Sequence, residues 1–406
     1  MGNRLIPPQK KSDMNEMRDV SKREKDLRQV VREFFTDATA DLVLEAHDCA
    51  AEHFDEDFAK YARVADILLS QQADPVVIAG AFLAPLRQYG SIKTDEIRSR
   101  FGETLAALVE QVFSEDVLRT DTEAHREADL QRFLTSISGD LRAVILRVGL
   151  RLAELERLVD QGDGERQDMA QETLDLYVPL ADRMGLGALR TRLEDVCLHI
   201  LQPTIYDELA RSLEETRLED EAYLALLTDG TKRLLKQQGI KSAIHSRKKG
   251  LYSLYHKMCR LDASPRDVLD RLGLRIIVSS VEDCYTVLGF LHTHFRPVPG
   301  AFDDYIGLPK ANGYQSLHTC VYPVPDVSRK PVEFQIRTQA MHREAEYGIA
   351  AHWRYKSEAE AQAHHDRQLQ WLQGLLSQRE EAANHEDFIE RLRQQVFGDE
   401  QRVGTT

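Results

Sequence analysis

The hydrophobic pattern of this 406-residue chain changes near Gly239, and that change limits the folds it can adopt. Before Gly239, apolar residues recur every three or four positions, as in LRAVILRVGLRLAELERLV, which is typical of amphipathic helices. After it, alternating and β-branched runs predict strands at Leu272–Ser280, His318–Val324 and Val332–Thr338. The helical pattern returns over Glu358–Phe397. The sequence therefore predicts a multidomain protein: an all-α region, an α+β region with a mixed sheet, and a helical tail.

Charge is distributed as unevenly as hydrophobicity. The chain carries a net charge of −14, whereas residues 241–356 hold 17 Lys and Arg against 11 Asp and Glu, a net of +6. The remainder therefore carries −20. A protein that binds nucleic acid over its whole surface needs a basic excess, so we expect no direct nucleic-acid binding here. The local basic segment favours a smaller phosphate-bearing partner.

No segment predicts membrane insertion or secretion. The longest apolar stretch, Pro75–Leu86, has 12 residues and two prolines, whereas a bilayer span needs roughly 20 apolar residues. The N-terminus lacks the apolar region of a secretory signal. The five cysteines are scattered, with no CxxC metal motif and no disulfide framework. We expect a cytoplasmic protein with reduced cysteines.

The basic segment His245–Arg260 contains five cations and no acid. A solvated helix face is the ordinary explanation of such a run. Two features favour a nucleotide instead: Tyr252 and Tyr255 are interleaved with the cations, and a helix start offers N–H groups to anions. Arginine can stack on a base, while lysine and serine hold phosphates. The candidate contacts are Arg247, Lys249, Ser253 and Lys257.

Two carboxylates flank the predicted strands. Asp270 precedes Arg275 at the start of one strand, and Glu333 opens another. A structural ion pair would also explain Asp270 and Arg275. Mg²⁺ prefers one or two carboxylates together with substrate oxygens and water, so Asp270 and Glu333 are candidate Mg²⁺ ligands.

Glycine, proline and asparagine predict a loop over Phe302–Thr319. Tyr314 in this loop could stack on a purine while Asn312 or Gln315 reads its edge; the alternative is a surface loop anchored in the core by its tyrosine. The chain contains neither GxxxxGK[ST] nor GxGxxG, which excludes a P-loop and a Rossmann site.

Together these motifs resemble the synthetase domain of RelA/SpoT homologues, the enzymes that make (p)ppGpp. SRKKGLYSLYHKM resembles its adenosine-side segment, DRLGLRIIV its Mg-binding strand, and PVPGAFDDYIGLPKANGYQSLHTCV its guanosine loop. VEFQIRTQAMHREAEYGIAAHWRYK resembles its second catalytic strand and the helix after it. The resemblance implies a nucleotidyltransferase-like α+β fold in which the 3′-hydroxyl of GTP or GDP attacks the β-phosphate of ATP and releases AMP, with Mg²⁺ as cofactor.

On the ATP side, the resemblance assigns Arg247 and Arg275 to the pair that sandwiches adenine. The positions that match its phosphate contacts are Lys249, Ser253 and Lys257. Lys248 and Gly250 replace the family's usual Pro and His, and neither position needs its side chain for these roles.

On the acceptor side, Asp270 and Glu333 match the Mg²⁺ carboxylates, and Glu333 also matches the base for the 3′-hydroxyl. Tyr314 is expected to stack on guanine. The guanosine-loop positions are Lys310, Asn312, Tyr314, Gln315 and His318. Ala301–Asp304 resembles the acidic ExDD of synthetase-only RelA, with Ala301 replacing the first acid.

The N-terminal helices resemble the HD-type hydrolase domain of the same family, in which two His and two Asp hold Mn²⁺. Here the aligned metal and catalytic positions hold Lys60, Ala84, Pro85, Gln88, Tyr89 and Leu150. The segment AFLAPLRQYG contains no metal ligand, so this domain is expected to be a degenerate, non-hydrolytic one. His47 and His53 are then ordinary helix residues.

The resulting domain plan is a flexible arm, a degenerate HD domain, a helical connector, a synthetase domain and a helical tail, over 1–25, 26–195, 196–238, 239–356 and 357–406. Long family members continue into a ribosome- and tRNA-binding half close to where this chain ends. Those partners are expected only if a longer chain exists.

Two other functions stay open at this level. One is a catalytically silent guanine-nucleotide-binding regulator, which the retention of both Asp270 and Glu333 disfavours. The other is transfer of pyrophosphate to the 3′ end of tRNA, which the intact guanosine loop with Tyr314 disfavours.

Overall fold

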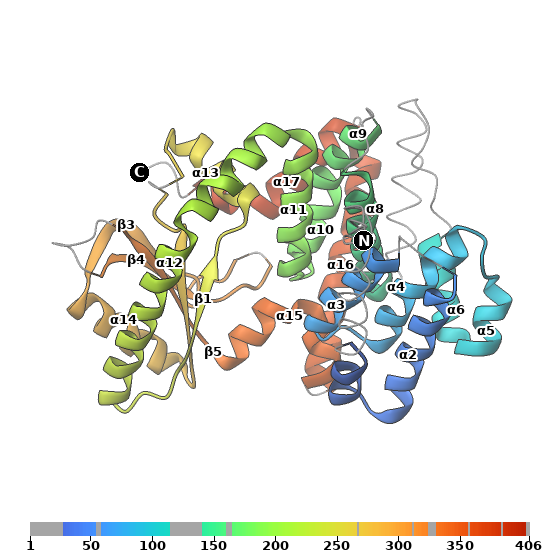
Figure 1. Ribbon diagram of the computed structural model, residues 1–406, viewed down its shortest axis with the longest axis horizontal. Helices are drawn as coiled ribbons and strands as arrows, with labels where there is room; N and C mark the ends of the chain where they lie inside the picture. Colours follow the sequence, from blue (N-terminus) through green and yellow to red (C-terminus); the bar gives the residue numbers. More distant parts are fainter. Residues whose placement is uncertain are drawn as a thin grey trace, which may run out of the picture. The chain divides into compact units, whose positions relative to one another are not determined.

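The chain forms two compact units, Met1–Ala153 and Glu154–Thr406 (Figure 1). The computed structural model describes residues 27–53, 58–113, 140–159, 165–265, 268–310, 312–323, 330–355, 358–382 and 385–402. Among them, no helix combines the length and the apolar character that crossing a bilayer requires.

The first unit is helical, as predicted. Its helices are α2 (Asp37–Ala51), α3 (Phe58–Ser70), α4 (Pro75–Gln88), α5 (Thr94–Phe101), α6 (Glu103–Phe113) and most of α8 (Leu141–Leu158). Asp74 caps α4 by accepting a hydrogen bond from the Val76 N–H at 2.8 Å, and Pro75 occupies the first turn, where its missing N–H costs nothing. Every residue of α4 from Val77 to Leu86 is buried, so this helix forms the centre of the unit.

The second unit surrounds a five-stranded sheet with helices. Its helices are α9 (Glu165–Glu172), the π-helical turn Thr173–Tyr177, α10 (Val178–Arg183), α11 (Gly187–Leu201), α12 (Pro203–Gln237), α13 (Leu251–Leu261), α14 (Val281–His294), α15 (Gln339–Tyr355), α16 (Glu358–Glu381) and α17 (His385–Arg402). Its strands are β1 (Ala243–Lys248), β2 (Leu272–Val278), β3 (Arg296–Asp304), β4 (Leu317–Tyr322) and β5 (Val332–Thr338). Ser280 caps α14 in a capping box with Asp283.

The sheet is mixed, as predicted. Its strand order is β1-β2-β5-β4-β3; β2 and β5 are parallel, and the other pairs are antiparallel. Because side chains alternate across a strand, β5 sends Val332, Phe334 and Ile336 to one face and the polar residues between them to the other.

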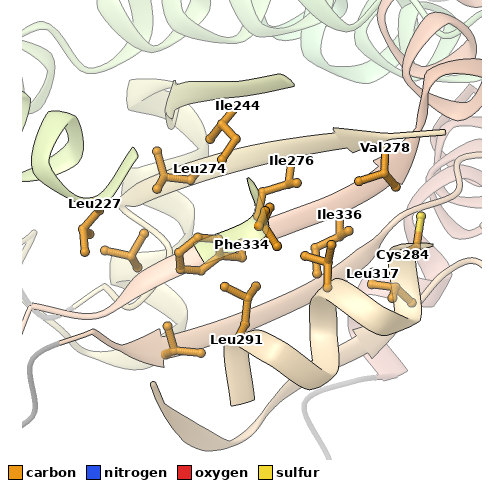
Figure 2. Packing of buried hydrophobic residues seen from close by; sticks show 14 of the residues in the cluster. Leu227, Ile244, Leu274, Ile276, Val278, Cys284, Leu291, Leu317, Phe334 and Ile336 are labelled. Atoms are coloured by element: carbon orange, nitrogen blue, oxygen red, sulfur yellow. The ribbon is translucent and has the colours of Figure 1, made fainter. Parts of the chain in front are cut away.

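The apolar face carries the core of this unit. Side chains from β2, β4 and β5 pack there against α12 and α14 (Figure 2). Leu227 of α12 and Cys284 and Leu291 of α14 belong to this cluster. Since two helices cover the apolar face, the site must form on the opposite, polar face.

The two edge strands, β1 and β3, were not predicted. The basic segment was expected to surround a helix start, but Arg247 and Lys248 lie in β1 and α13 begins only at Leu251. Likewise, Phe302–Asp304 was expected in a loop and instead completes β3. An edge strand pairs on one side only and buries little, so it lacks the apolar alternation that identifies a central strand.

Two glycines allow α15 to cross the turn between α10 and α11. Gly348 lies within α15 at φ +48° and ψ −133°, a conformation that suits glycine alone. A Cβ on Gly348 would meet the Met184 carbonyl oxygen at 2.3 Å, and a Cβ on Gly185 would meet the Gly348 Cα at 2.6 Å. The backbones of the two segments therefore touch directly.

We expect Gly348→Ala to lower the stability of this unit by about 2 kcal/mol or more, since it combines a left-handed φ with a backbone collision. Thermal unfolding monitored by circular dichroism measures the effect. Gly230→Ala is the matched control: Gly230 lies within α12 with nothing near its Cβ position, and alanine there should stabilise by up to about 1 kcal/mol. Equal melting temperatures for the two variants would contradict the crossing.

Candidate active site

A glycine in β2 lets one guanidinium reach across the polar face of the sheet. The register places Arg247 of β1 opposite Gly273 of β2, and Gly273 opposite Glu333 of β5. Because Gly273 has no side chain, Arg247 extends over β2, and its Nη1 donates to Glu333 Oε2 at 3.1 Å. Two of the predicted site residues are thus brought together.

Asp270 lies in the turn before β2 and is held by two lysines. Its Oδ2 accepts from Lys249 Nζ at 2.8 Å and lies 2.7 Å from Lys257 Nζ. Burial opposes the carboxylate's charge, but the two ammonium groups outweigh it, and the pKa of Asp270 is lowered. Ser253 is half-buried in the first turn of α13, the helix that carries Lys257.

Glu333 is buried and ionised. Gln335 Nε2 donates to its Oε2 at 2.7 Å, and His318 Nδ1 lies 3.4 Å from its Oε1. Burial alone would raise the pKa of Glu333, but His318 and Arg247 lower it to about 2. The carboxylate therefore stays charged at any physiological pH.

His318 links Glu333 to Tyr314 in the preceding loop. Its Nε2 lies 2.9 Å from the Tyr314 hydroxyl. Burial alone would lower the pKa of His318, but Tyr314 and Glu333 raise it to about 9, so the imidazole is protonated at neutral pH. Tyr305 contacts both rings edge-on, with centroids 6.2 Å from Tyr314 and 5.2 Å from His318. Tyr314 is half-buried, and the hydrogen bond between its hydroxyl and His318 fixes the orientation of its ring.

The other side chains predicted to bind guanosine make contacts of their own. Lys310 Nζ lies 4.9 Å from the Tyr305 ring centroid. Gln315 Nε2 donates to the Ile306 carbonyl at 3.2 Å. Asn312 Oδ1 accepts from the Tyr314 N–H at 3.0 Å, which fixes the turn before the tyrosine.

Arg337 and Glu346 belong to this polar face and were missed from the sequence. Glu346 of α15 lies 2.8 Å from both Arg275 Nη1 and Arg337 Nη2, and Arg337 is 1% exposed. Arg337 Nη2 also donates to His342 Nδ1 at 2.8 Å. The signal was available: Arg337 follows Glu333 and Gln335 at two-residue spacing in the same strand.

Asp270 and Glu333 fit the demands of a divalent cation. Asp270 Oδ1 is buried and has no hydrogen-bond partner, which leaves a ready-made acceptor for a cation. Both carboxylates have a lowered pKa, and Glu333 lies close enough for its charge to act on Asp270. Carboxylate oxygens are what Mg²⁺ prefers.

The first unit offers no comparable arrangement among its described residues. Three of the aligned hydrolase positions are buried in apolar surroundings: Ala84, Pro85 and Leu150. Gln88 is half-buried, Tyr89 is half-exposed, and the side chain of Lys60 lies outside the described part. Over the described ranges of the chain, no three His, Cys, Asp or Glu residues gather as metal ligands would.

The two histidines of the first unit make local contacts. His47 is buried, with its Nδ1 2.9 Å from Asp48 Oδ1 and its ring edge-on to Phe82 at 5.4 Å. His53 Nδ1 lies 2.8 Å from the Cys49 carbonyl oxygen. These are packing and helix-end contacts.

His342 makes the stability of the second unit sensitive to acid. Burial, together with the Arg337 guanidinium, lowers the pKa of His342 to about 4 from 6.5. Its neutral form therefore contributes stability that is fully present above pH 6.5 and is lost as the pH falls towards 4.

We expect His342→Gln, whose amide oxygen can still accept from Arg337, to reduce the loss of stability between pH 7 and pH 5 by about 1 kcal/mol. Differential scanning fluorimetry measures this, with exposed His294→Gln as control; identical pH profiles for the unmutated chain and His342→Gln would refute it.

Two family models match successive parts of the chain. Residues 246–360 match a family model described as a region found in RelA / SpoT proteins, and residues 40–187 match an HD domain model. The small alarmone synthetase 1 from Bacillus subtilis bound to its product pppGpp is 26% identical, with a TM-score of 0.30; the match covers 43% of this chain and 96% of that one.

Two curated relatives match most of the chain. The GTP pyrophosphokinase of Escherichia coli (strain K12) is 35% identical over 350 residues, covering 84% of this chain and 47% of that protein. A probable guanosine-3′,5′-bis(diphosphate) 3′-pyrophosphohydrolase of Synechocystis is 35% identical over 348 residues, covering 84% and 45%. The chain thus spans about half the length of these relatives. With an HD domain followed by a RelA/SpoT region, it belongs to the RelA/SpoT family.

Proposed function

We propose that this chain is a GTP pyrophosphokinase that makes (p)ppGpp by transferring pyrophosphate from ATP to the 3′-hydroxyl of GTP or GDP, releasing AMP. The observation that carries the proposal is the polar face of the sheet, where three carboxylates are each shared by two cations. This arrangement has more positive than negative charge before any ligand binds. Two polyphosphates supply the missing negative charge.

On the donor side, Arg247 and Arg275 would hold adenine between their guanidinium planes. Lys249 and Lys257 would turn from Asp270 towards the ATP phosphates, with Ser253 as a further donor. Phosphoryl transfer depends mainly on positioning and on neutralising charge, and these residues supply both.

On the acceptor side, Tyr314 would stack on guanine and Glu333 would receive the proton of the 3′-hydroxyl. In the free protein Arg247 Nη1 donates to Glu333 Oε2 at 3.1 Å. Because a guanidinium donates in its plane and stacks through its face, Arg247 could hold Glu333 and stack on adenine at the same time.

We propose Mg²⁺ as the cofactor, held by Asp270 and Glu333. When bound, it neutralises charge that develops on the transferred group. We further propose that the HD domain is non-hydrolytic, since aligned ligand positions hold Ala84, Pro85 and Leu150, whose side chains offer no donor atom.

A nucleotide assay tests the synthetase. The unmutated chain, incubated with Mg²⁺, γ-labelled ATP and GTP or GDP, should yield labelled penta- or tetraphosphate. We expect Asp270→Asn and Glu333→Gln each to lower kcat by about 100-fold or more, because each removes charge at the reacting groups. Glu282→Gln, an exposed position on α14, is the matched control and should retain full activity. No product from the unmutated chain would refute the proposal, and a labelled tRNA 3′ end in a parallel reaction would point to the other acceptor.

A second assay tests the HD domain. With Mn²⁺ and (p)ppGpp, the unmutated chain should release no pyrophosphate above the rate of a no-protein blank. Release that survives Glu333→Gln but needs Mn²⁺ would show that the first unit is an active hydrolase.

A further inference from the structure

The α10–α11 segment (Val178–Leu201) contacts the elements that carry the donor site, the acceptor site and the arginine-pairing Glu346. None of its residues belongs to the nucleotide motifs. Three independent contacts indicate what the segment does.

Asp195 of α11 caps the donor-side helix. Its Oδ1 accepts from the Tyr252 N–H at 2.9 Å, at the N-terminus of α13. Lys249 directly precedes the N-cap of this helix, and Lys257 lies within it. Gly250, the N-cap of α13, is pressed against the same helix: a Cβ there would meet Thr191 Cγ2 at 2.8 Å and Asp195 Oδ1 at 3.3 Å. A carboxylate from α11 therefore accepts a hydrogen bond from the first turn of α13. Gly250, where the family usually has His, leaves room for α11, because a Cβ there would collide with Thr191.

Asp182 of α10 holds the acceptor loop. Its Oδ2 accepts from Asn312 Nδ2 at 3.1 Å, and Asn312 in turn fixes the Tyr314 N–H. Asp182 is itself paired with Arg190, whose Nε donates to the buried Glu194 at 2.8 Å. A series of hydrogen bonds and ion pairs therefore leads from buried Glu194 in α11, through Arg190 and Asp182, to Asn312. Asn312 belongs to the turn that orients Tyr314, the tyrosine proposed to stack on guanine.

Glu194 and Asp195 are neighbours in α11. The contacts that lead to the acceptor loop and the carboxylate that caps α13 therefore begin at adjacent positions of this helix. The turn before this helix meets α15 at the Gly185–Gly348 crossing, two residues from Glu346. All three elements are therefore held by contacts with one segment of the same unit.

We infer that the α10–α11 segment is the frame that sets the distance between the two nucleotides, with Asp195 positioning the ATP-phosphate helix and Asp182 positioning the guanosine loop. Both act through other residues and touch neither substrate. The inference rests on the proposed function for the identity of the two nucleotides.

The test compares two alanine variants with their amide counterparts. Asp195→Ala should raise the KM for ATP about five- to tenfold, the effect of losing a helix cap, and leave the KM for GTP within about twofold. Asp182→Ala should do the reverse. Asp195→Asn and Asp182→Asn keep an oxygen that can accept from Tyr252 N or Asn312 Nδ2, so both should return towards the unmutated KM. Glu208→Ala, exposed on α12, is the control.

Amide hydrogen exchange supplies a readout that does not depend on activity. Asp195→Ala should speed exchange at the start of α13, and Asp182→Ala at residues 313–316, each without affecting the other site. If the unmutated chain makes no (p)ppGpp, the proposed function fails, yet the exchange pattern still decides whether the frame exists. Equal rises in both KM values for either alanine variant, or unchanged exchange in both, would overturn the inference.

Discussion

The second unit depends on one constraint, the alternation of side chains along the buried strand β5. Val332, Phe334 and Ile336 fill the core, while Glu333, Gln335 and Arg337 lie on the opposite face, and all are almost fully buried. Burying a charged group is costly unless it is paired, which is why Glu333 bonds to Arg247 and Arg337 to Glu346. A slip of one residue would exchange the two faces and destroy core and site together.

This constraint decides what the sequence could predict. The central strand β2 could be predicted because it is almost entirely apolar, and β5 because its apolar residues alternate with polar ones. The edge strands β1 and β3 are polar or carry proline. Motif residues such as Asp270 and Glu333 were found by their chemistry. Asp182 and Asp195 were not, because their partners lie 130 and 57 residues away and an acid on a helix normally faces water.

Each of the three carboxylates on the polar face of the sheet is paired with two cations. Asp270 pairs with two lysines, Glu333 with an arginine and the protonated His318, and Glu346 with Arg275 and Arg337. The carboxylates keep the cations folded against the sheet and lower the cost of crowding like charges. Three carboxylates do not neutralise six cations, so this face of the sheet stays positive although the whole chain has a net charge of −14.

The two-to-one ratio also permits exchange of partners. If a ligand drew away one cation of such a pair, the carboxylate would keep the other. At Asp270, where both lysines are proposed to turn to the ATP phosphates, the proposed Mg²⁺ would take their place. In a one-to-one ion pair, the cation could contact a nucleotide phosphate only after leaving its carboxylate with no partner. Sharing each carboxylate between two cations would keep the free site ordered and still let a lysine such as Lys249 or Lys257 reach a ligand.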